Sequence, residues 1–68
     1  MSPARYSIVI EGELDALAAH AFDDVALERS DGRTRLQTAE VDQAGLNGVL
    51  DRLRAIGAVL HNVDRIDD

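Results

Sequence analysis

The hydrophobic pattern changes period several times along the chain, and each change marks the start of a new element. Alternating apolar residues predict a half-buried strand that starts at Arg5 and ends at Gly12, because successive side chains of a strand lie on opposite faces. Tyr6, Ile8 and Ile10 then share the face expected to be buried. Apolar residues spaced three and four apart next predict a short, alanine-rich helix over residues 13–22.

A β-hairpin is expected after this helix. Residues 25–30 place Val25, Leu27 and Arg29 on one face of a strand, and residues 33–41 form a second strand-like run. Asp31 and Gly32 separate the two runs. An Asp-Gly pair is typical of a two-residue hairpin turn, because both positions of that turn require positive φ.

The clearest helical pattern follows Asp42, which is a good N-cap residue. The helix is expected to end at Gly57, where a left-handed residue commonly stops a helix. Gly45 and Gly48 weaken this helix and are either tolerated or allow another segment to approach closely. One apolar stripe runs along the helix and contains Leu46, Val49, Leu50, Leu53 and Ile56. Alternation resumes over residues 59–64 and predicts a last strand.

The element order is therefore β-α-β-β-α-β, which is typical of the α+β ferredoxin-like fold. In that fold, four antiparallel strands take the order 4-1-3-2 and two helices cover one face of the sheet. A chain of 68 residues sustains one hydrophobic core, so residues 1–68 are expected to form a single domain.

Composition narrows the possible functions. Thirteen acidic residues outnumber seven arginines, there is no lysine, and the formal net charge is −6. This balance opposes binding to nucleic acid, which needs clustered cations. The chain has no cysteine, so thiolate chemistry and disulfides are excluded. The sequence has no leader-like start and no long apolar run, and we therefore expect a cytoplasmic protein without membrane contact.

Two long segments, YSIVIEGELDALAAHAF and VDQAGLNGVLDRLRAIGAVLHNV, together with the DG turn, resemble small stand-alone bacterial proteins that have ferredoxin-like folds and no assigned function. The segment IEGELDALA is distantly similar to the turn between the first strand and first helix of ACT domains. ACT domains bind amino acids and other small effectors, usually at dimer interfaces. This second resemblance implies a ligand site at Glu11, Gly12, Glu13 and Asp15.

The same acidic residues also have the alternation of a calcium-binding loop. Glu11, Glu13 and Asp15 occupy the first, third and fifth positions of such a loop. The glycine required at the sixth position is absent, however, and Phe22 occupies the twelfth. No metal or other cofactor is therefore expected, and these carboxylates are interpreted as solvated turn residues.

Catalytic chemistry has little support in the sequence. Strict alternation places His61 on the same face as Val59 and Val63. There it is either a general base in a cleft between sheet and helix or a hydrogen-bonded histidine at the edge of the core. No serine lies in a nucleophile motif with a histidine to activate it. The chain is therefore expected not to be an enzyme.

The helix-free face of the sheet is the candidate interaction surface. Alternation places four aliphatic residues there, and these form the expected interface: Val9, Ala39, Val41 and Leu60. Because a core this small leaves little net stability, we expect a homodimer. The leading hypothesis is a protein-interaction module that self-associates through its sheet or an edge strand and binds a protein partner. The alternative is an ACT-like regulatory domain that binds a small molecule.

Overall fold

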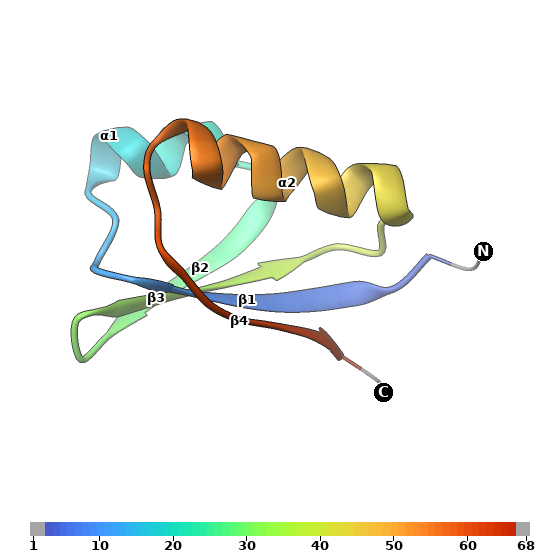
Figure 1. Cartoon of the computed structure of the whole chain (residues 1–68), viewed down its shortest axis with the longest axis horizontal. Coiled ribbons are helices and arrows are strands. Elements are labelled where there is room, and N and C mark those ends of the chain that lie inside the picture. Colours follow the sequence, from blue (N-terminus) through green and yellow to red (C-terminus); the bar gives the residue numbers. More distant parts are fainter. Residues whose placement is uncertain (1–2, 67–68) are drawn as a thin grey trace.

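A computed structural model of the chain describes residues 3–66. The elements in chain order are β1 (Arg5–Glu11), α1 (Ala16–Ala19), the 3₁₀ helix η1 (His20–Phe22), β2 (Val25–Ser30), β3 (Arg33–Thr38), α2 (Gln43–Ala55) and β4 (Leu60–Ile66) (Figure 1). The strands form one antiparallel sheet in the order β2-β3-β1-β4, which is 4-1-3-2 when counted from β4. The α+β class and the four-stranded antiparallel sheet are thus confirmed. Figure 1 shows α1 and α2 on the same side of the sheet.

The hydrophobic core lies between this sheet and the helices. Its buried side chains are Ile8, Ile10, Leu36, Phe22, Val49 and Leu53. They come from β1, β3, η1 and α2, so the core joins strands and helices that are distant in sequence. The expected inward face of β1 is confirmed for Ile8 and Ile10, whereas Tyr6 on the same strand is only half-buried. Leu50, from the apolar stripe of α2, is also only half-buried.

Both ends of α2 are capped as the sequence predicts. Asp42 accepts a hydrogen bond from the backbone N–H of Gly45 at 2.8 Å. At the other end, Gly57 has φ +74°, and the N–H of Ala58 donates to the carbonyl of Leu53 at 3.0 Å. This is the Schellman arrangement, which satisfies a helix carbonyl that would otherwise lack a partner.

The turn between β2 and β3 is also confirmed. Asp31 has φ +55° and Gly32 has φ +76°, the paired positive angles of a type I′ turn. Because β2 and β3 pair without interruption up to this turn, their register is regular from end to end. Arg33 and Arg35 consequently lie on the same face of β3.

The first helix is shorter than expected. Its N-cap is Asp15, whose carboxylate accepts from the N–H of Ala18 at 2.7 Å, so the helix begins at Ala16 and not at residue 13. The chain then tightens into η1 after Ala19. Leu17, an apolar residue of this short helix, is 82% exposed.

A β-bulge in β4 overturns two further expectations. Val9 pairs with Asn62 but Ile10 pairs with Leu60, so His61 is an extra residue on β4 at this point. Leu60 therefore shares the helix-covered face with Ile10, and His61 lies on the open face. Strict alternation placed each of them on the opposite face, because it does not allow for an inserted residue.

Candidate functional site

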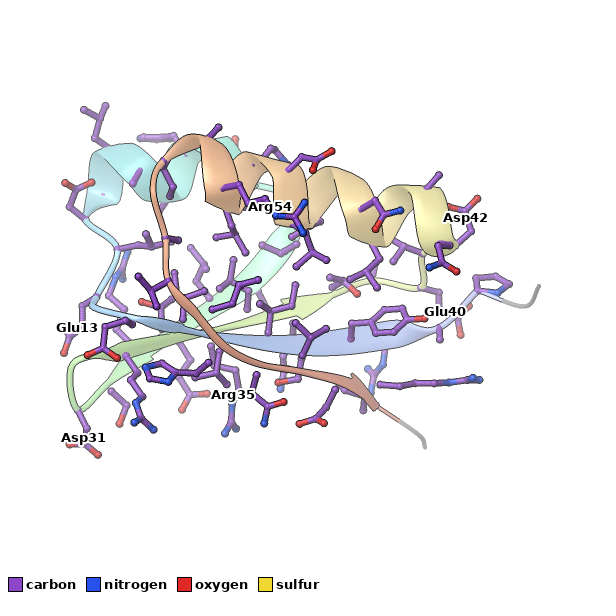
Figure 2. All side chains as sticks on the ribbon, in the orientation of Figure 1. Glu13, Asp31, Arg35, Glu40, Asp42 and Arg54 are labelled. Atoms are coloured by element: carbon purple, nitrogen blue, oxygen red, sulfur yellow. The ribbon has the colours of Figure 1, made fainter. Side chains whose placement is uncertain are left out.

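The open face of the sheet is polar near the turn between β2 and β3. On β3, Arg33 lies beside Glu11 of β1. Arg35, two residues further along the strand, lies between Glu28 of β2 and Val9 of β1. Figure 2 shows Arg35 projecting from the sheet on the side away from the helices. Each of these two arginines on β3 thus has an acidic residue beside it on a neighbouring strand.

These side chains surround an open hollow of about 740 Å³. Residues from all four strands and from the β2–β3 turn contribute to it. They are Val9, Glu11, Glu28, Ser30, Asp31, Arg33, Arg35, His61 and Asn62. The volume is within the range of small-molecule sites, but the charged walls differ from the mainly apolar walls of most such sites.

The bulge brings His61 into contact with Glu11 across the strand pair. The Nε2 atom of His61 hydrogen-bonds to Oε2 of Glu11, although the two residues are far apart in sequence. This hydrogen bond is the main cause that holds the pKa of the Glu11 carboxyl below its ordinary value. The charges of His61 and of Arg33 act in the same direction. Glu11 therefore stays ionised, and one of its oxygens is already engaged.

The two arginines in the hollow differ from those on α2. Arg52 forms an ion pair with Asp24 at 3.0 Å, and Arg54 forms one with Asp51 at 2.9 Å. Within residues 3–66, neither Arg33 nor Arg35 has an ion pair or a side-chain hydrogen bond. Their guanidinium groups are exposed and free to bind a ligand.

Of the four residues in the expected ligand site, Glu11 lines the hollow and the other three have structural contacts. The carbonyl of Gly12 accepts from the Thr34 hydroxyl at 2.8 Å. The carboxylate of Glu13 accepts from the N–H of Gly32 at 3.1 Å. Asp15 is the N-cap of α1. These contacts hold the β1–α1 turn beside the hairpin.

The expected aliphatic interface does not form on the open face. Val41 pairs with the buried residue Ala4 and lies against the first turn of α2. Leu60 also faces the helix side, because of the bulge. Val9 lines the polar hollow, and Ala39 is exposed just after β3. Two of the four residues are thus on the wrong face for a common patch with Val9.

Comparison with known proteins places the chain in a family. The matching region is residues 5–64, which includes every strand and helix apart from the last two residues of β4. The chain belongs to the DUF8691 family, a domain of unknown function. No curated protein and no solved structure matches it. Within residues 3–66 of this DUF8691 domain, no helix is long and apolar enough to cross a membrane.

The DUF8691 domain has a second surface that the sequence pattern did not indicate. Four of the five large, exposed hydrophobic side chains in the described residues fall between the end of α2 and the middle of β4. They are Ile56, Val59, Leu60 and Val63, here called the β4 strip, with exposures of 46, 61, 36 and 39%. β4 is also an edge strand, so one side of its backbone has no neighbouring strand. The sequence pattern does not indicate this strip, because the bulge that places Leu60 on the same side as Val63 is not visible in the pattern.

Proposed function

We propose that this DUF8691 domain is a non-enzymatic protein-interaction module with a ferredoxin-like fold, and that it self-associates along β4. The β4 strip is the observation that carries the proposal. Exposed edge strands readily pair with another strand, and proteins usually protect them with charges, prolines or covering segments. Here apolar side chains flank the first part of the edge, which is typical of an interaction surface, and the charged residues Asp64 and Arg65 follow further along β4.

A second copy of the chain is the partner that best fits this edge. A two-fold axis beside β4 pairs the strand antiparallel with its own copy and places both β4 strips on the same side of the joined sheet. The strips then meet across the axis. Stable interfaces bury about 800 Å² on each partner. This is about a fifth of the 4445 Å² accessible surface, which is a large gain for a domain with so small a core.

Light scattering of the purified protein at high micromolar concentration tests this proposal. We expect a dimer for the unmodified chain and a monomer for the Ile56→Asp/Val59→Asp variant, because both side chains are well exposed and burying a carboxylate in the interface is costly. Leu17→Asp is the matched control, since Leu17 is an exposed aliphatic residue on α1, outside the β4 strip. Circular dichroism checks that each variant remains folded.

The controls also distinguish β4 from the open face as the interface. Val9→Asp places a charge on the open face and should leave the dimer intact. A monomeric unmodified protein, or a dimer that is lost in Val9→Asp but kept in the Ile56→Asp/Val59→Asp variant, would contradict association through β4.

A regulatory domain that binds a small molecule is the second candidate function. The polar hollow on the open face favours it, because Glu11 belongs both to this hollow and to the site implied by the distant ACT-like resemblance. The remaining residues of that implied site, Gly12, Glu13 and Asp15, lie outside the hollow. A ligand would therefore bind on the sheet and not at the turn between β1 and α1.

A further inference from the structure

We infer that the hollow on the open face binds a small anion, through a carboxylate or phosphate group held by Arg33 and Arg35. This inference does not depend on self-association, because pairing along β4 leaves the open face accessible. It rests on three features of the hollow: the spacing of the two arginines, the balance of groups that lack hydrogen-bond partners, and the size of the space.

The spacing places both guanidinium groups above the same area of the sheet. Arg33 and Arg35 are two residues apart on β3, so their side chains leave the same face about 7 Å apart along the strand. Arg35 is seen on that face in Figure 2. A guanidinium group donates two parallel hydrogen bonds to a carboxylate or phosphate, and two such groups at this spacing can hold one anion between them.

The groups that lack hydrogen-bond partners favour an anion over a cation. Two carboxylates in the hollow already have neighbours: Glu11 bonds His61, and Asp31 has the hydroxyl of Ser30 at 3.5 Å. Among the described residues, Glu28 is the one lining carboxylate without a partner, against the two guanidinium groups of Arg33 and Arg35. The hollow therefore offers more unsatisfied donors than acceptors.

The overall acidity of the protein does not prevent anion binding. Charges that are exposed and more than about 8 Å away are largely screened at physiological ionic strength. The charges of the hollow itself therefore decide the potential felt by a bound group, and these are the two guanidinium groups and the carboxylates of Glu11, Glu28 and Asp31. Ser30 and Asn62 add polar side chains to the wall, and the space of about 740 Å³ accommodates a metabolite-sized molecule.

Titration followed by NMR tests the site directly. The labelled protein is titrated with inorganic phosphate in one series and with succinate in another, each against sodium chloride at equal ionic strength. We expect saturable shifts of the β3 amides at Arg33 and Arg35 in at least one series. The ligand that saturates at the lower concentration identifies the preferred anionic group. Shifts that match the chloride series in both titrations would overturn the inference.

Charge-neutralising variants show whether the arginines hold the anion. Arg33→Gln/Arg35→Gln should weaken binding at least about tenfold, because charge-assisted hydrogen bonds are lost. The matched control is Arg54→Gln, which removes one exposed arginine from α2, on the helix side of the molecule (Figure 2). We expect no change in that control. Equal affinity in the double variant and the unmodified protein would refute the role of the two arginines.

A third variant should strengthen binding, which damage to the fold cannot imitate. Glu28 lies directly beside Arg35 on the neighbouring strand and competes with a ligand for that guanidinium group. Glu28→Gln should therefore increase affinity by roughly two- to fivefold, the range of an exposed pairwise charge interaction. Weaker binding of phosphate or succinate to Glu28→Gln would show that Glu28 does not compete with the anion for Arg35 and would overturn the inference.

Discussion

Alanine substitution should stabilise the domain at Gly48 but not at Gly45, although both glycines lie inside α2. A methyl group added at Gly48 has no described atom within 4 Å beyond the backbone of its own helix. A methyl group at Gly45 would lie 2.9 Å from Cβ of Val41 and 3.3 Å from its Cγ1. Both glycines weaken the helix, but only Gly45 is required for close packing.

The magnitudes follow from two opposing effects. Alanine is better than glycine in a helix interior by about 1 kcal/mol, so Gly48→Ala should stabilise the domain by about that amount. At Gly45 the same gain is offset by overpacking, which costs about 1–3 kcal/mol. Rotation of the Val41 side chain cannot relieve this contact, because Cβ is bonded directly to the backbone. Gly45→Ala should therefore be neutral or destabilising by up to about 2 kcal/mol.

Urea unfolding monitored by far-UV circular dichroism measures both effects. The midpoints of the two variants should lie on opposite sides of the unmodified value, or Gly45→Ala should coincide with it. Since about 1 kcal/mol shifts the melting temperature of a domain this small by about 4–8 °C, thermal unfolding should resolve the pair as well. Equal stabilisation by both substitutions would refute the close approach of Val41 to α2. Destabilisation by Gly48→Ala would show that this face of α2 is covered.

Two further predictions concern buried polar contacts and acid stability. Thr34 is fully buried, donates to the carbonyl of Gly12 and accepts from the N–H of Leu14, so Thr34→Val should cost about 1–3 kcal/mol in urea unfolding; an unchanged midpoint would contradict these bonds. The hydrogen bond from Arg52 holds the pKa of Asp24 below its ordinary value of 3.8, so the stabilisation from this pair is complete above that pH and is lost as the pH falls through the lowered folded-state pKa. Asp24→Asn should accordingly be less stable than the unmodified protein near neutral pH, by less than about 1 kcal/mol because the pair is exposed, and equally stable in strong acid. A stability difference that persists in strong acid would exclude ionisation of Asp24 as its cause.

The parts of the fold that the sequence predicts correctly depend on contacts within a few residues. The caps of α2 require only Asp42, three residues before the N–H it accepts from, and Gly57 at the position that needs positive φ. The turn at Asp31 and Gly32 is equally local. The start of α1 was wrong because several acidic residues compete for the N-cap, and hydrophobic spacing alone does not decide between them. In the structure Asp15 is the N-cap, and Leu17 is exposed.

The positions of His61 and Leu60 in the candidate surfaces could not be predicted in the same way, because they depend on the bulge at His61. A bulge is a property of two paired strands, and the register of β1 with β4 joins residues about 50 positions apart, such as Val9 and Asn62. No residue in residues 59–64 interrupts the alternation, so the pattern predicts a regular strand there. One inserted residue then exchanges the faces of its neighbours. It moves His61 into the hollow beside Glu11 and moves Leu60 to the side of Val63. The bulge therefore affects both surfaces, because it brings His61 to Glu11 in the polar hollow and adds Leu60 to the β4 strip.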